Sequence, residues 1–224
     1  MNWADLEGLE LDTDLDAAAL ALERGPEQPQ FELPQNRFLR REAKDRLKKG
    51  RRGIKQLIRP ENARGVVPHL PEPGEHTHAL LRGDFVLCDL VPAIIEHRGR
   101  CPHLRIATLG LSTANADALL HLQAMGRVGA IGILCSHYFQ QVDKATTYRE
   151  VAARLDGRAT LIVARNHAKV ICVPTEAGDH FVIEGSANLR SSDNIEQIAI
   201  FNDRELLNWH CEWMADVASK GGAP

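Results

Sequence analysis

Residues 166–197 read NHAKVICVPTEAGDHFVIEGSANLRSSDNIEQ, and this stretch decides the fold that we predict. Two apolar runs flank the turn-like segment TEAGD, which is typical of adjacent strands. Side chains at positions i and i+2 of a strand point to the same face, so His167 and Lys169 should project together. Ser186 and Asn188 should do the same from a neighbouring strand. An imidazole, an ammonium, a hydroxyl and an amide on one face have the chemistry to bind a phosphate group.

The segments around this stretch extend the pattern into a larger domain. Strand-like apolar runs occupy 83–91, 104–111, 129–139, 159–166 and 195–202, and helical patterns occupy 112–126, 143–157 and 204–220. Ser112 or Thr113 should cap the first of these helices, and Gly126 should end it. Strands and helices that alternate, followed by adjacent strands, predict an α/β fold with a mixed β-sheet flanked by helices on both faces.

The composition changes upstream of residue 80. Residues 1–35 form an acidic segment with nine acidic side chains and one basic. We expect residues 36–79 to form a basic helix and a loop-rich linker, and residues 80–224 to form the α/β domain. The domain is thus predicted to follow an N-terminal helical and loop extension.

A dense block of positive charge lies in this extension. Residues 36–59 carry eleven Lys and Arg side chains against two acidic ones, which favours binding to nucleic acid, DNA more than RNA. The residues expected to make these contacts are Arg40, Arg41, Lys44, Lys48, Lys49, Arg51 and Arg52. Neutralising six phosphates would give a log–log salt slope of about −5. The alternative is a solvated helix that lies against the acidic segment. If the block does bind nucleic acid, the acidic segment would mask it when nucleic acid is absent.

The order of the motifs in the C-terminal half resembles the phospholipase D superfamily. The chain has H-x-K, then G-S-x-N, then a Glu eight residues after the Asn, while family members carry H-x-K…D…G-S-x-N and include nucleases. The resemblance implies that His167 attacks phosphorus and that Lys169 stabilises the phosphate charge. It also implies that Ser186 and Asn188 complete the phosphate pocket and that Glu196 orients the imidazole. No metal and no cofactor is implied.

The resemblance covers about residues 104–216 and departs from the family pattern at one position. The family Asp, five residues after the Lys, is replaced by Pro174, and Asp179 either takes its role or sits in a hairpin turn. The family's chemistry also needs a second histidine to protonate the leaving oxygen. Since the chain has one H-x-K motif, the resemblance implies a homodimer that brings two copies of His167 together.

Other features narrow the class of protein. The five cysteines are scattered without a C-x-x-C pair, so buried reduced thiols are expected. The residues His69, His76, His78 and His103, with Cys101, match no standard zinc spacing and are expected to lie in loops. No apolar run approaches the ~20 residues that cross a bilayer. The acidic start does not resemble a secretory signal, and we expect a cytoplasmic location.

We therefore predict a metal-independent, homodimeric phosphodiesterase that cleaves nucleic acid. The alternative is a catalytically inactive phospholipase D-like fold that serves as a nucleic-acid-binding or assembly protein. A lipid phosphodiesterase has less support, because the sequence has no apolar helix or aromatic loop for docking to a membrane.

Overall fold

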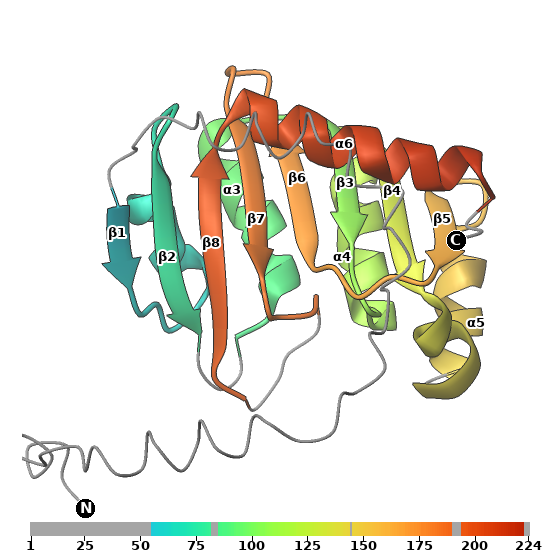
Figure 1. Ribbon diagram of the computed structural model, residues 1–224. Helices are drawn as coiled ribbons and strands as arrows, with labels where there is room; N and C mark the ends of the chain where they lie inside the picture. Colours follow the sequence, from blue (N-terminus) through green and yellow to red (C-terminus); the bar gives the residue numbers. More distant parts are fainter. Residues whose placement is uncertain (1–54, 82–84, 144, 190–193, 222–224) are drawn as a thin grey trace, which may run out of the picture. The chain divides into compact units, whose positions relative to one another are not determined.

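One mixed β-sheet organises the chain (Figure 1). The computed structural model describes residues 55–81, 85–143, 145–189 and 194–221, all within the compact unit Lys49–Pro224. The eight described strands lie in the order β1-β2-β8-β7-β6-β3-β4-β5. Their bounds are β1 Lys55–Ile58, β2 His76–Leu81, β3 Cys101–Ala107, β4 Val128–Ser136, β5 Thr160–Ala164, β6 Val170–Pro174, β7 His180–Gly185 and β8 Glu196–Asn202. The pairs β1–β2, β3–β4 and β4–β5 are parallel, and the other neighbouring pairs are antiparallel.

Helices cover both faces of this sheet. The helical segments are η2 Ala63–His69, η3 Leu87–Asp89, α3 Leu90–Arg98, α4 Thr113–Ala124, η4 Phe139–Asp143, α5 Ala145–Leu155 and α6 Arg204–Ser219. Figure 1 shows α6 lying across the front of the sheet, with α3 and α4 behind it. The predicted fold class is therefore confirmed: a mixed sheet between two helical layers.

The buried side chains explain why strand β6 lies at the centre. All of its residues are buried, and they alternate between two apolar clusters. Ile171 and Val173 pack with the helices behind the sheet, while Val170 and Cys172 pack on the α6 side. A strand that is covered on both faces needs such a continuous apolar run.

Two helix starts follow the expected capping chemistry. The Ser112 hydroxyl accepts a hydrogen bond from the backbone N–H of Asn115, whose side chain accepts from the Ser112 N–H in return. This capping box starts α4 as predicted, and Gly126 follows it with a φ of 69°. The Asp203 carboxylate caps α6 in the same way by accepting from the N–H of Leu206 at 3.0 Å.

The region before α4 differs from the expectation in two places. Residues 83–91 were expected as a strand, but Leu87–Asp89 is a 3-10 turn and α3 begins at Leu90. Helix α3 has buried side chains around much of its circumference, so its apolar run lacks helical periodicity. Strand β1 and the start of β2 also lie inside the stretch 36–79, so the described sheet begins upstream of the expected start at residue 80.

The remaining expectations concern cysteines, membranes and the N-terminal extension. All five cysteines are free thiols; four of them are buried as predicted, and Cys211 is half-buried. In the part of the chain that the structure describes, no helix is both long and apolar enough to span a bilayer. The acidic segment 1–35 and the nucleic-acid-binding residues predicted between Arg40 and Arg52 lie outside the described residues.

Candidate functional site

The candidate site lies where several strands end at one edge of the sheet. Strands β3, β4 and β5 are mutually parallel, so their carboxyl ends meet at this edge, which is the lower one in Figure 1. Strand β6 runs antiparallel to β3 and begins there, just after His167 and Lys169. Strand β7 ends there before Ser186, and β8 begins there at Glu196. The topology thus gathers segments of the chain that are far apart in sequence.

The imidazole and the ammonium of the H-x-K motif are direct neighbours. The Nζ of Lys169 lies 3.1 Å from the Nδ1 of His167 and donates to the His167 carbonyl oxygen at 2.9 Å. His167 is exposed and Lys169 is half-buried. Because an ammonium can only donate, the Nδ1 beside it acts as the acceptor in this arrangement. The resemblance implies that Glu196 orients the ring, but here the imidazole contacts Lys169 instead.

Partial burial changes the acid–base properties of Lys169. Desolvation lowers the pKa of its ammonium below the ordinary value, and the nearby negative charge of Glu196 opposes this change. The Glu196 carboxylate therefore favours the charged form of the ammonium. A loss of that carboxylate would weaken the cation that faces His167.

A hydrogen-bond network joins the G-S-x-N turn to the start of β8. The Ser186 hydroxyl donates to the Glu196 carboxylate and accepts from the backbone N–H of Gln197 at 3.1 Å. The Ser186 N–H donates to the Gln197 carbonyl at 3.0 Å. This close approach requires Gly185, because a Cβ at that position would lie 2.1 Å from the Gln197 oxygen.

Asn188 ties the same turn to the end of β3. Its Oδ1 accepts a hydrogen bond from the backbone N–H of Leu109 at 3.3 Å. The residue is half-buried, unlike the exposed Ser186. Its visible contact is thus with the backbone of the neighbouring loop, which fixes the turn beside the H-x-K motif.

Asn166 is a site residue that the sequence analysis missed. Its Nδ2 donates to the carbonyls of Thr108 at 3.1 Å and Leu134 at 3.3 Å, which lie at the ends of β3 and β4. Its Oδ1 accepts from the N–H of Ala168 at 2.9 Å. These bonds hold both flanks of His167. An amide directly before the H-x-K motif was the available signal.

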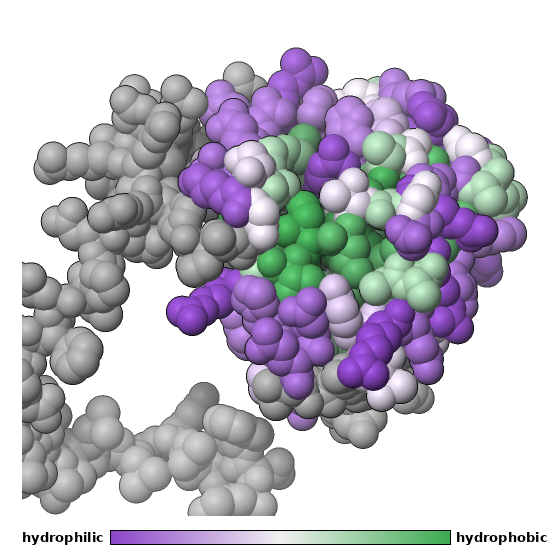
Figure 2. All heavy atoms as spheres, turned by 90° about the vertical axis from the view of Figure 1, so that its right-hand side faces the viewer, coloured by the Kyte–Doolittle hydropathy of each residue, from purple (hydrophilic) through white to green (hydrophobic). Residues whose placement is uncertain are grey.

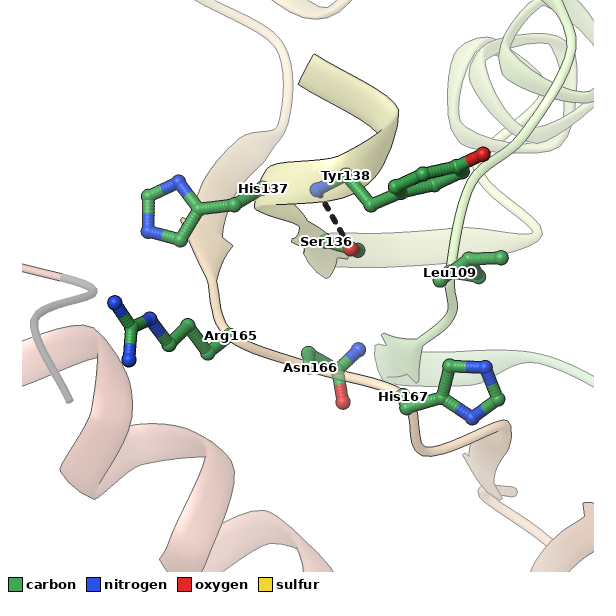
Figure 3. Close-up of a pocket in the computed structure, with 7 residues that line it drawn as sticks. All are labelled: Leu109, Ser136, His137, Tyr138, Arg165, Asn166 and His167. Carbon is green, nitrogen blue, oxygen red and sulfur yellow. Dashed lines mark hydrogen bonds between the residues drawn. The ribbon is translucent and has the colours of Figure 1, made fainter. Parts of the chain in front are cut away.

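A pocket opens next to His167, at the carboxyl ends of β4 and β5. Its volume is about 440 Å³, and its lining residues are Leu109, Ser136, His137, Tyr138, Arg165, Asn166 and His167 (Figure 3). Apart from His167, none of these residues was predicted from the sequence, because a motif search does not reveal which loops lie side by side.

Asp179 lies at the opposite edge of the sheet, in the hairpin between β6 and β7. It is buried, and its carboxylate accepts hydrogen bonds from the Asn202 amide at 2.8 Å and the Thr175 hydroxyl at 3.4 Å. Pro174 pairs with His180 at the same end of β6. Asp179 therefore holds the hairpin against the end of β8 and is remote from His167.

The histidines considered for zinc do not form a cluster. His76 and His78 lie on β2 and not in the expected loop, and His103 lies on β3. Within the described ranges, no group of three or more His, Cys, Asp and Glu side chains has the geometry to hold a metal ion.

Three solved structures are similar to a part of the chain. Nuc, a phospholipase D family member from Salmonella typhimurium, is 19% identical over 59% of this chain and 87% of its own, with a TM-score of 0.46. TrmBL2, an archaeal chromatin protein, is 14% identical over 64% of this chain and 52% of its own, with a TM-score of 0.42. Polyphosphate kinase from Porphyromonas gingivalis is 10% identical over 67% of this chain and 26% of its own, with a TM-score of 0.48.

The chain thus spans about half of TrmBL2 and about a quarter of that polyphosphate kinase. No protein-family model and no curated protein matches the sequence.

Proposed function

We propose that the chain is a metal-independent phosphodiesterase that cleaves nucleic acid through a phosphohistidine at His167. One observation carries the proposal. The exposed imidazole of His167 lies at the same strand edge as the Lys169 ammonium and the Ser186–Glu196 pair, next to an open pocket. A nucleophile beside a cation, at the mouth of a pocket, has the features that phosphoryl transfer requires.

The proposed reaction has two displacements at phosphorus. In the first, an imidazole nitrogen of His167 forms a bond to phosphorus, the bond to the leaving oxygen breaks, and that oxygen takes a proton. In the second, water attacks phosphorus, the nitrogen–phosphorus bond breaks, and a phosphate monoester is released with return of the proton. Lys169 would neutralise the non-bridging oxygens, whose negative charge grows in the transition state.

We propose a homodimer because the leaving oxygen needs an acid. His167 becomes phosphorylated and cannot also donate that proton, and the described chain has one H-x-K motif. A two-fold axis that brings a second His167 to the site would supply the acid. The basic residues from Arg40 to Arg52 would add affinity for nucleic acid, DNA more than RNA.

The function is tested by incubating plasmid and single-stranded DNA with the protein in EDTA, wild type beside His167→Ala. We expect wild type to cleave and the variant to be inactive with unchanged folding. Cleavage by the variant at the wild-type rate would disprove the role of His167.

The dimer is tested separately by exchanging subunits between wild type and His167→Ala at equal amounts. If both histidines are needed for one site, only the pure wild-type dimers remain active, so about a quarter of the activity per total protein should remain. If each subunit acts alone, about half should remain, and the shared site would be disproved.

A binding protein without catalysis is the second candidate. It is favoured by Pro174 at the family Asp position and by the contact of His167 with Lys169 in place of Glu196. In that case wild type and His167→Ala would both shift DNA in a gel, and neither would cleave it.

A further inference from the structure

The pocket beside His167 has two chemically different sides. Figure 3 shows Tyr138 and Leu109 extending to the same side as His167, and Arg165 and His137 extending to the other side. All five residues line the same pocket. One side is therefore aromatic and aliphatic, and the other carries a guanidinium and an imidazole.

The apolar side is built on a firmly held segment of the chain. The N–H of Tyr138 donates to the Ser136 hydroxyl at 2.9 Å, and the next residue, Phe139, is 1% exposed. The Tyr138 side chain itself is 50% exposed. A half-exposed aromatic ring on a rigid backbone is a surface on which a planar group can stack without ordering the protein further.

The polar side of the pocket carries the guanidinium of Arg165. Arg165 is exposed and makes no ion pair or side-chain hydrogen bond with another described residue. The Nδ1 of His137 is buried without a hydrogen-bond partner in the part of the chain that the structure describes, so Arg165 is the group on this side that a ligand can reach. An exposed guanidinium without an ion-pair partner favours an anion, and a phosphate suits the fork of Arg.

We propose that this pocket is a nucleoside subsite, in which Tyr138 stacks on the base next to the reacting phosphate and Arg165 binds the following phosphate. The inference rests on the proposed function, because it places the reacting phosphate at His167. A base can lie on Tyr138 only when it is unstacked from its neighbours, so the preferred substrate is single-stranded nucleic acid. A volume of about 440 Å³ lies in the range of pockets that enclose small organic ligands.

The decisive comparison uses two single-stranded DNA oligonucleotides that differ at one position. One has a normal nucleotide next to the cleaved bond, and the other has an abasic nucleotide there. Tyr138→Ala should lower kcat/KM for the normal strand about tenfold or more, and should leave kcat/KM for the abasic strand unchanged. Tyr138→Phe keeps the ring and should behave as wild type. Equal effects of Tyr138→Ala on both strands would overturn the subsite.

The cationic side is tested through the salt dependence of binding. Arg165→Gln should reduce the log–log salt slope of single-stranded oligonucleotide binding by about 0.7, because it removes one phosphate contact. Arg149→Gln, on the exposed face of α5, is the matched control and should leave the slope unchanged. An unchanged slope in Arg165→Gln would exclude the phosphate contact.

Binding to His167→Ala separates this inference from the proposed function. The dissociation constant of a short oligonucleotide, measured by fluorescence anisotropy, does not depend on cleavage. Adding Tyr138→Ala to His167→Ala should weaken binding about tenfold. Cleavage by His167→Ala would contradict the proposed function alone, whereas unchanged binding in the double variant would contradict the subsite alone.

Discussion

Replacing Asn166 with Asp tests how the fold holds the candidate nucleophile in place. The change keeps the size of the side chain and the acceptor for the N–H of Ala168. It replaces the amide donor by an oxygen that faces the carbonyls of Thr108 and Leu134, which now lie 3.1 and 3.3 Å from Nδ2. Two attractive contacts thus become repulsive ones.

The magnitude follows from those contacts. Each lost hydrogen bond contributes about 0.5–1.5 kcal/mol, and a carboxylate close to two partly buried carbonyls adds to the loss. We expect the free energy of unfolding of Asn166→Asp to fall by about 2–4 kcal/mol at neutral pH. Repulsion by the carbonyls raises the pKa of the new carboxyl in the folded state, and protonation restores one donor. The difference from wild type should therefore shrink as the pH falls toward about 4, the ordinary pKa of Asp.

Urea unfolding at two pH values measures this effect. Asn208→Asp, on the exposed surface of α6, is the control and should stay within about 0.5 kcal/mol of wild type. Because Asn166 fixes both flanks of His167, activity should also fall about 10–100-fold. If Asn166→Asp had the same urea midpoint of unfolding as wild type and full activity, the role of Asn166 would be refuted.

Three other predictions follow from the same edge of the sheet and from α6. Gly185→Ala should lower the free energy of unfolding, measured with urea, by about 1–3 kcal/mol, because its Cβ would lie 2.1 Å from a backbone oxygen of β8. Gly65→Ala is the control and should match wild type, because a Cβ there would lie 3.4 Å from its nearest neighbour, the Cβ of Pro60. Cys211 should react with iodoacetamide at neutral pH before the other cysteines, because a hydrogen bond from the Cys172 thiol lowers its pKa to about 7. Peptide mass spectrometry measures the labelling of each cysteine, and equal labelling would contradict this prediction. Activity should fall on the alkaline side below pH 10.5, because burial lowers the pKa of Lys169, and Glu196→Gln should move that fall to lower pH; an unmoved pH–rate profile would contradict the pairing.

Local sequence patterns predict the centre of this fold well. The runs around β6 and β7 are apolar and bounded by turn residues, and the Ser112 capping box marks the start of α4. In such segments the local preference and the packing favour the same structure.

Prediction fails where tertiary contacts decide the structure. Helix α3 begins with a run in which Leu90, Val91, Ala93, Ile94 and Ile95 are buried, and such a run resembles the apolar run of a central strand. Strand β1 is the outermost strand of the sheet, and β2 lies next to it. Polar residues such as His76 and His78 interrupt the apolar pattern of β2. These elements are defined by their neighbours and not by their own periodicity.

In the candidate site, too, some features follow from local sequence and others only from the tertiary structure. The spacing of the motif residues predicts that His167 and Lys169 project together from a strand. The structure places them in direct contact, but in the loop before β6 and not on a strand. The partners of Glu196 and the pocket around Tyr138 and Arg165 depend on which loops the strand order brings together. No spacing within one segment encodes that order.

The stereochemical course of the reaction tests the central claim most directly. A phosphorothioate diester of one configuration at phosphorus would be hydrolysed by the wild-type protein in water enriched in heavy oxygen, with EDTA present. A phosphohistidine at His167 requires two in-line displacements, so the account predicts retention of configuration at phosphorus. Inversion would mean that water attacks the diester directly, and it would contradict the account.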